Sequence, residues 1–172
     1  MKKNLYLLLF VLILSAAAKA QTNWVTTKLD ERISVKFPVE PQKTTNNGVD
    51  VYTARMSDSL GYSATVIDYN VIAHLDSAAI APMKDMQQFA DQIRIGLASK
   101  KVNYTFGAVT MGKWKGYTTY SMTAIENTNK NTLLVQMILI GSRMYSLSCR
   151  VPAGMVTKNN EVFFASVELL KK

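Results

Sequence analysis

The amino-acid sequence predicts an α+β fold, with a central antiparallel sheet covered by one long helix and one short helix. Three observations lead to this prediction. Residues 133–151 form two apolar segments joined by Gly141-Ser142, a strong hairpin signal. Residues 82–100 carry apolar side chains at helical spacing, and residues 157–165 are typical of a short helix. Short strand-like segments separated by turn residues fill most of the remaining chain, as expected for an antiparallel sheet.

The Gly141-Ser142 turn is typical of a type II′ hairpin, because glycine stands where the turn needs a positive φ. A two-residue turn also sets the register of the strands that it joins. One face of the hairpin should therefore carry the pairs Ile140/Arg143, Ile138/Tyr145, Gln136/Leu147 and Leu134/Cys149. The first strand is apolar on both faces, which predicts that both faces of the sheet are covered.

The long helix is predicted within a helical stretch from residue 76 to residue 101. Five apolar residues recur there at spacings of three and four: Met83, Met86, Ala90, Ile93 and Leu97. Pro82 suits the first turn of such a helix, where a backbone N–H is not needed. The stripe indicates a helix that packs on the sheet.

The remaining strands follow from short alternating segments between turn signals. We expect them at residues 24–30, 33–37, 49–56, 62–71, 102–111, 117–125 and 167–169. Residues 44–48 are polar and end in Asn47-Gly48, a turn signal, and residues 112–116 are predicted to form a loop.

The first 20 residues have the pattern of a secretory signal peptide. Lys2 and Lys3 precede an apolar run at residues 5–18, and a small-x-small motif ends at Ala20, so cleavage is expected between Ala20 and Gln21. The alternative is a membrane anchor, for which the apolar run is short. We therefore expect a bacterial protein that is periplasmic or secreted and keeps no stable membrane span after cleavage.

Removal of residues 1–20 leaves 152 of the 172 residues, which suits a single α/β domain at residues 21–172. It takes three of the 20 basic residues and none of the 12 acidic ones, so the net charge falls from +8 to +5. The basic residues are scattered along the mature chain. This distribution argues against nucleic acid as a partner, because nucleic-acid binders gather their basic residues in a patch or stripe.

The sequence lacks the clusters of residues that a catalytic site or a metal site requires. It has one histidine, His74, and one cysteine, Cys149, which do not supply a metal site, and its acidic residues are spread along the chain. Cys149 is predicted to be a small buried hydrophobic residue, since a nucleophile would need a basic partner. We therefore predict no catalytic residues, no metal and no cofactor, and a protein that is not an enzyme.

One segment is a candidate contact patch. It consists of Lys113, Trp114, Lys115 and Tyr117, at or beside the tip of a predicted loop. A tryptophan between two cations can anchor a protein interface, because aromatic side chains carry much interface energy. The alternative is that Trp114 folds back and caps an open end of the core.

Two functions fit these observations. The first is an interaction or assembly module that binds another envelope component. The second is a carrier of a small apolar ligand, held between helix and sheet by adaptable methionine side chains: Met83, Met86, Met137 and Met144.

Three segments also carry a resemblance to a known family. They are a strand end with Phe37-Pro38 and Pro41, the segment GSRMYSL at residues 141–147, and the helix end FFASV at residues 163–167. With the signal peptide, the meander and the long helix, the chain resembles small exported bacterial proteins of the PsbP-like fold over roughly residues 24–170. The resemblance implies an α/β/α sandwich with a central antiparallel sheet. It implies no catalytic residues, and fold alone does not transfer the photosystem role of the family's namesake.

Overall fold

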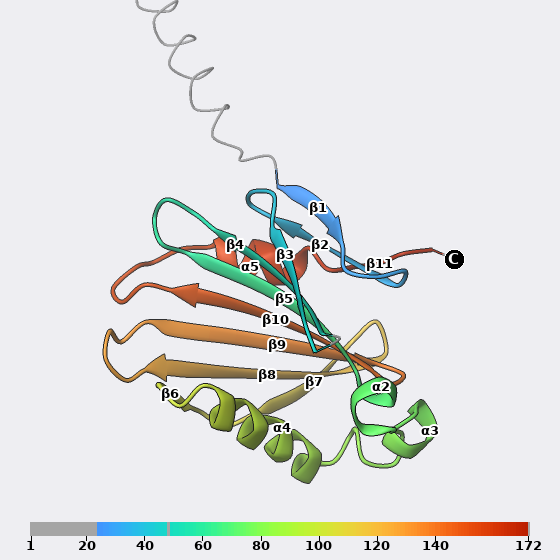
Figure 1. Cartoon of the computed structure of the whole chain (residues 1–172). Helices are drawn as coiled ribbons and strands as arrows, with labels where there is room; N and C mark the ends of the chain where they lie inside the picture. The colour runs from blue at the N-terminus through green and yellow to red at the C-terminus, as the bar shows by residue number, and fades with distance from the viewer. Residues whose placement is uncertain (1–23, 48, 172) are drawn as a thin grey trace, which may run out of the picture.

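The computed structural model describes residues 24–47 and 49–171; the predicted signal peptide and its cleavage site at Ala20 and Gln21 lie outside them. Two antiparallel sheets dominate this part of the chain (Figure 1). The larger sheet consists of β3 (Gln42–Asn46), β4 (Val49–Arg55), β5 (Gly61–Asp68), β6 (Tyr104–Phe106), β7 (Thr110–Trp114), β8 (Tyr117–Glu126), β9 (Thr132–Ile140) and β10 (Arg143–Val151). The smaller sheet consists of β1 (Val25–Lys28), β2 (Ile33–Phe37) and β11 (Glu168–Leu169). The helices are α2 (Tyr69–Ala73), α3 (Ser77–Ile80), α4 (Gln87–Lys100) and α5 (Asn159–Ala165).

The predicted hairpin of β9 and β10 lies at the middle of the larger sheet. The strand order is β3-β4-β5-β10-β9-β8, and β6 and β7 pair with different parts of β8. The predicted register is confirmed, because Ile140 pairs with Arg143 and Ile138 with Tyr145. Gly141 has a φ of +64°, as the turn requires.

Both faces of the larger sheet are covered near this hairpin, as predicted (Figure 1). On one face the smaller sheet and α5 pack on the strands. We call the buried apolar side chains on this face the first core cluster. Its largest buried side chains include Phe37, Tyr62, Tyr145, Leu147 and Phe163. On the other face α3 and α4 pack on the strands. This second core cluster includes Ile80, Ala90, Tyr120, Met137 and Met144.

The prediction of one helix over residues 82–100 is wrong at its beginning. The chain forms α3, a series of turns from residue 81 to residue 85, and only then α4 from Gln87. Met86, at the N-cap of α4, is extended, with φ −96° and ψ 137°. The hydroxyl of Tyr120 donates to the carbonyl oxygen of Lys84, which therefore has a partner outside any helix. Tertiary contact thus overrides the helical periodicity at this point.

Several other boundaries differ from the prediction, and the single strand predicted at residues 102–111 is wrong, because this segment forms β6 and, from Thr110, the beginning of β7. The strand predicted at residues 62–71 ends at Asp68. The carboxylate of Asp68 accepts a hydrogen bond from the backbone N–H of Asn70 at 3.0 Å, and Asp68 is therefore the N-cap of α2. The polar segment at residues 44–48 belongs in part to β3, an edge strand that apolar alternation cannot reveal because its side chains are polar. The second predicted helix begins at Asn159, two residues later than expected.

Candidate contact site at the tip of the β7–β8 hairpin

The tip of the β7–β8 hairpin holds the four predicted contact residues, Lys113, Trp114, Lys115 and Tyr117. The predicted loop at residues 112–116 is wrong, because β7 continues to Trp114, which pairs with Tyr117. The turn itself contains only Lys115 and Gly116, with φ values of +48° and +85°. Two consecutive positive φ angles are characteristic of a type I′ turn, whose twist matches that of the flanking strands. The short turn holds the strand ends firmly together.

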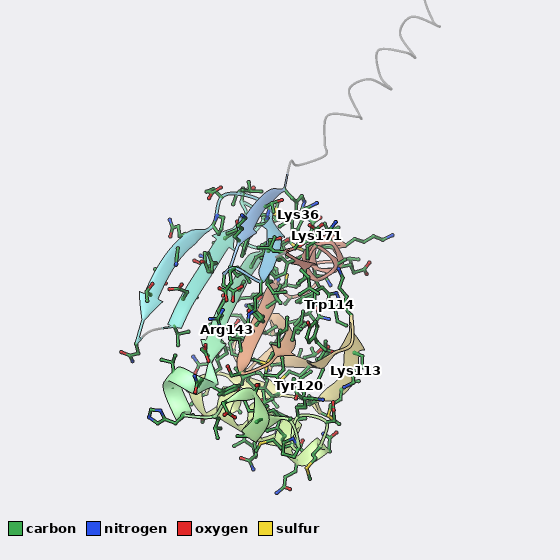
Figure 2. The ribbon with its side chains drawn as sticks, turned by 90° about the vertical axis from the view of Figure 1, so that its right-hand side faces the viewer. Lys36, Lys113, Trp114, Tyr120, Arg143 and Lys171 are labelled. Atoms are coloured by element: carbon green, nitrogen blue, oxygen red, sulfur yellow. The ribbon has the colours of Figure 1, made fainter. Side chains whose placement is uncertain are left out.

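Lys113 lies on the face of the hairpin that meets the segment before α4 (Figure 2). Its Nζ is 2.6 Å from Oδ1 of Asp85 and 3.0 Å from Oγ1 of Thr118, which itself donates to the same carboxylate oxygen at 2.7 Å. Lys84 also pairs with Asp85. Hydrogen bonds from Lys113, Lys84 and Thr118 hold the pKa of the Asp85 carboxyl well below its usual range. Lys113 therefore fastens the segment before α4 to the hairpin.

Trp114 lies on the opposite face of the hairpin from Lys113, because side chains alternate along a strand (Figure 2). Its half-buried ring packs against the first core cluster, as does that of Tyr117. The exposed Lys115 places its Nζ 5.2 Å from the centroid of the Trp114 ring, within the range of a cation–π interaction. The Trp114 ring thus packs on the first core cluster and lies next to the Lys115 ammonium group at the surface.

A small cavity lies beside the tip. It has a volume of about 210 Å³ and is bounded by α3 and by the turns of the β7–β8 and β9–β10 hairpins. Its lining includes Ser77, Ile80, Lys84, Gly116, Tyr117 and Gly141. The cavity brings Tyr117 of the predicted contact patch and Gly141 of the central hairpin turn, which are distant in sequence, to one surface.

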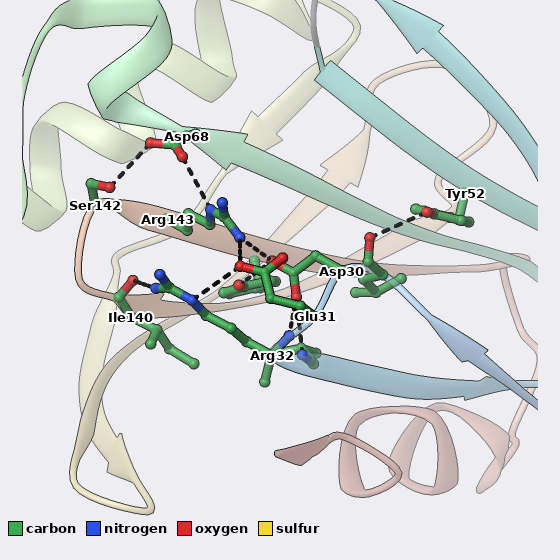
Figure 3. Close-up of polar contacts among 11 residues, drawn as sticks. Asp30, Glu31, Arg32, Tyr52, Asp68, Ile140, Ser142 and Arg143 are labelled. Carbon is green, nitrogen blue, oxygen red and sulfur yellow. Dashed lines mark hydrogen bonds and ion pairs between the residues drawn. The ribbon is translucent and has the colours of Figure 1, made fainter. Parts of the chain in front are cut away.

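Arg143, the first residue of β10, joins three carboxylates at the same end of the sheet (Figure 3). Its Nη1 is 2.9 Å from Oδ2 of Asp30 and 2.5 Å from Oε1 of Glu31, and its Nε is 3.0 Å from Oδ2 of Asp68. Asp30 and Glu31 belong to the loop between β1 and β2, whereas Asp68 ends β5. Arg143 therefore ties the smaller sheet to the larger one.

Asp30 accepts more hydrogen bonds than the other carboxylates of this network. Its Oδ1 accepts the backbone N–H groups of Arg32 at 2.8 Å and of Ile33 at 3.0 Å, and its Oδ2 accepts the hydroxyl of Tyr145. Burial acts to raise the pKa of Asp30, but these bonds and the one from Arg143 outweigh it and lower the pKa. The carboxylate is held ionised and fully engaged, which suits a structural brace.

Cys149 and His74 lie far apart in the fold. Cys149 is fully buried in the first core cluster, and burial raises the pKa of its thiol to about 12, so the prediction that it is a small buried residue is confirmed. It pairs with Tyr62 near the beginning of β5, whereas the exposed His74 follows the far end of that strand. Tyr62 and Asp68 are six positions apart along the strand, a distance of about 20 Å. Among the described residues, no group of three or more histidine, cysteine or carboxylate side chains is arranged to hold a metal ion.

The four methionines of the carrier hypothesis have different surroundings. Met137 and Met144 are 3% and 1% exposed in the second core cluster. Met83 and Met86 lie in and after the turns before α4, and Met86 is 49% exposed. These last two line a shallow hollow of about 210 Å³ together with Phe89 and two glutamines.

Comparison with known proteins gives the fold a name. No family model and no curated protein matches the sequence. A crystal structure of a protein from Bacteroides thetaiotaomicron matches over 81% of this chain, with 16% identity and a TM-score of 0.44, and this chain spans 46% of that protein's length. The solution structure of cyanobacterial PsbP (CyanoP) from Synechocystis sp. matches over 88% of this chain and 95% of its own, with 8% identity and a TM-score of 0.60. This chain has a PsbP-like fold.

The PsbP-like fold confirms the resemblance that the three sequence segments carry. At 8% identity the likeness concerns the arrangement of the backbone alone, so side-chain roles must come from this chain's own geometry. Among residues 24–47 and 49–171, no helix combines the length and the apolar character needed to cross a membrane.

Two features of this end of the sheet escaped the sequence analysis. Asp85 lies 28 residues before Lys113, and Asp30 lies 113 residues before Arg143. Asp30, Lys113 and Arg143 lay next to predicted turns, which is common for charged residues on any surface, and Asp85 was predicted to lie within the long helix. The pairs became visible only when the fold brought the turns together.

Proposed function

We propose that the protein is an exported, non-enzymatic component of the bacterial cell envelope, which binds another envelope component through the tip of the β7–β8 hairpin. The observation that carries the proposal is the arrangement of Trp114 and Lys115. An aromatic ring supported by the core carries a cation 5.2 Å above it, at an exposed two-residue turn. Aromatic side chains that the protein already holds in place are favoured as interface anchors, because little conformational entropy is lost when a partner binds them.

Two features on the α3 side of the tip, opposite to Trp114, support the proposal. Lys113 is fastened to Asp85, so the hairpin is braced from the face opposite to Trp114. The cavity of about 210 Å³ beside the turn has room for one side chain of a partner. A rigid tip next to a small cavity is the geometry in which a partner side chain can be buried and surrounded by near-neutral contacts.

Site-specific photocrosslinking in the native envelope tests this proposal. The crosslinking residue replaces Lys115 and, as a matched control, Lys130, which is also an exposed lysine with positive φ at a hairpin connection. We expect position 115 to capture one specific envelope component and position 130 to capture none. The proposal fails if position 115 yields no product that position 130 lacks.

A pair of tryptophan variants separates binding from folding. Trp114 and Trp24 both pack half-buried against the first core cluster, so Trp114→Ala and Trp24→Ala should cost similar packing. We expect only Trp114→Ala to abolish the crosslink from position 115. Equal loss in both variants would mean that the fold, and not the tip, determines capture.

The carrier of a small apolar ligand remains the alternative prediction. The hollow at Met83 and Met86 is about 210 Å³, below the range of about 300–1,000 Å³ that is typical of small-molecule sites. The hairpin tip is therefore the better-supported surface. A small-molecule mass retained in native mass spectrometry of the envelope-purified protein would favour the carrier instead.

A further inference from the structure

The face of the larger sheet that carries the second core cluster is open to solvent where α4 does not cover it. Four register partners on neighbouring strands form a polar row across this open face: Gln42, Thr53, Ser63 and Ser148. The same row continues on β9 and β8 with Val135 and Met122, which are buried in the second core cluster. The row thus changes from polar to apolar where the cover of α3 and α4 begins (Figure 1). Among the described residues, no protein hydrogen bond uses the four polar side chains, so they are available to a ligand.

The neighbouring row supplies charge and space. Arg55, Gly61 and Arg150 are register partners on β4, β5 and β10. Gly61 has no side chain, so the floor between the two arginines stays open. Lys101, directly after α4, and Tyr104, at the start of β6, form the opposite wall. Together these residues line a groove of about 580 Å³, within the range that is typical of small-molecule sites.

The groove carries an excess of positive charge. Its lining includes Arg55, Lys101 and Arg150 but one carboxylate, Glu40. Among the described residues, no carboxylate oxygen lies within 4.0 Å of a side-chain nitrogen of Arg55 or Lys101. Arg150 has a single contact of 3.4 Å with Glu126. Cations without an internal partner attract an anionic group, and arginine binds carboxylate and phosphate in a bidentate manner.

We infer that this groove binds an anionic carbohydrate, a sugar unit that bears a carboxylate or a phosphate group. Arg55 and Lys101 bind the anionic group, and the polar row binds the sugar hydroxyls. Tyr104 stands beside Lys101, whose Nζ lies 5.9 Å from the centroid of the tyrosine ring, so the cation and the aromatic side chain form one wall of the groove. An extended peptide is a poorer occupant, because the groove lies on the face of the sheet, where neighbouring strands already use the backbone hydrogen bonds that strand addition requires.

Calorimetric titration of the purified protein tests the inference with four probes: trigalacturonic acid, glucose 6-phosphate, neutral maltotriose and hexaglutamate. We expect trigalacturonic acid or glucose 6-phosphate to bind at least about tenfold more tightly than maltotriose, since charge-assisted hydrogen bonds add that much. Binding should weaken as the salt concentration rises. Equal affinity for the acidic and neutral sugars, or no binding of any sugar, overturns the inference. Tighter binding of hexaglutamate than of either acidic sugar assigns the groove to an acidic peptide instead.

Variants locate the binding in the groove. The double substitution Arg55→Gln and Lys101→Gln should lower the affinity for the acidic sugar about tenfold or more, whereas Lys28→Gln and Lys130→Gln, at exposed lysines elsewhere, should leave it unchanged. Binding that survives the double substitution contradicts the assignment.

The substitution Gly61→Val fills the groove without removing a charged side chain. A Cβ at Gly61 would lie 3.7 Å from Cβ of Arg150, an ordinary contact, so Gly61→Val should fold and occlude the floor. We expect it to abolish sugar binding while the thermal unfolding midpoint stays close to that of the wild type. A folded Gly61→Val protein with unchanged affinity would place the sugar elsewhere.

Discussion

The two ends of β10 each carry an arginine, and the two differ in their partners. Arg143 meets three carboxylates, two from the loop between β1 and β2 and one from the end of the neighbouring strand β5. Arg150 has one contact with Glu126 and shares a groove with Arg55 and Lys101. An arginine whose charge the fold already neutralises braces the structure. Arg55 and Lys101, which have no carboxylate oxygen within 4.0 Å among the described residues, keep their charge for a ligand. The comparison therefore separates a structural end of the sheet from a candidate binding end.

Removal of Arg143 should have the largest effect on stability. Arg143→Ala leaves Asp30 and Asp68, whose side chains are 12% and 25% exposed, without their cation. We expect the free energy of unfolding in urea to fall by about 2–3 kcal/mol, because half-buried charges lose their compensation. Arg55→Ala in the groove, as the matched control, should change it by less than about 0.5 kcal/mol. Similar losses in the two variants would remove the distinction between the two ends.

Substitutions that remove a tyrosine hydroxyl at each end of the sheet provide a second test of the same difference. Tyr145→Phe keeps a fully buried ring but removes the hydrogen bond to Asp30. We expect a loss of about 1–2 kcal/mol in the free energy of unfolding. The matched substitution Tyr104→Phe, in the groove, should leave stability unchanged, since the ring is partly exposed. An unchanged urea midpoint for Tyr145→Phe would show that the Asp30 bond contributes little.

The central architecture was predictable because it depends on local rules. A two-residue turn sets the register of the β9–β10 hairpin, and the apolar residues on both faces of β9 require cover on both sides. The features that escaped prediction depend on contacts between distant segments. Tyr120 draws the carbonyl oxygen of Lys84 out of any helix, and Asp30 reaches Arg143 across 113 residues. The groove was hidden for the same reason, because the polar row exists only when four strands are aligned.

The Arg143 network should also make stability depend on pH. Burial tends to raise the pKa values of Asp30 and Asp68, but hydrogen bonds, including those from Arg143, lower both below their usual range in the folded state. Carboxyls with lowered folded-state pKa values add stability above the unfolded value of about 3.9, and that contribution is lost as the pH falls below it. We expect the free energy of unfolding to fall between about pH 5 and pH 3. In Arg143→Gln the fall should be shallower, because the two folded-state pKa values move toward the unfolded one; an identical slope would contradict this.

Lys113 should have the smallest global effect, because it braces a segment and not a sheet. Its side chain and that of its partner Asp85 are 53% and 50% exposed, so Lys113→Ala should barely change the urea midpoint. Its effect should be local: the contact holds the turn before α4 against the hairpin, so backbone amides near Phe89 and Ala90 should exchange hydrogen faster in the variant. Lys43→Ala is the matched control, since Lys43 also pairs at the surface, with Asp50, but far from α4. Faster exchange at α4 in Lys113→Ala alone would show that the cation chosen from the sequence as a contact residue positions α4. Unchanged exchange in both variants would instead leave Lys113 available to a partner, in agreement with the sequence-based prediction.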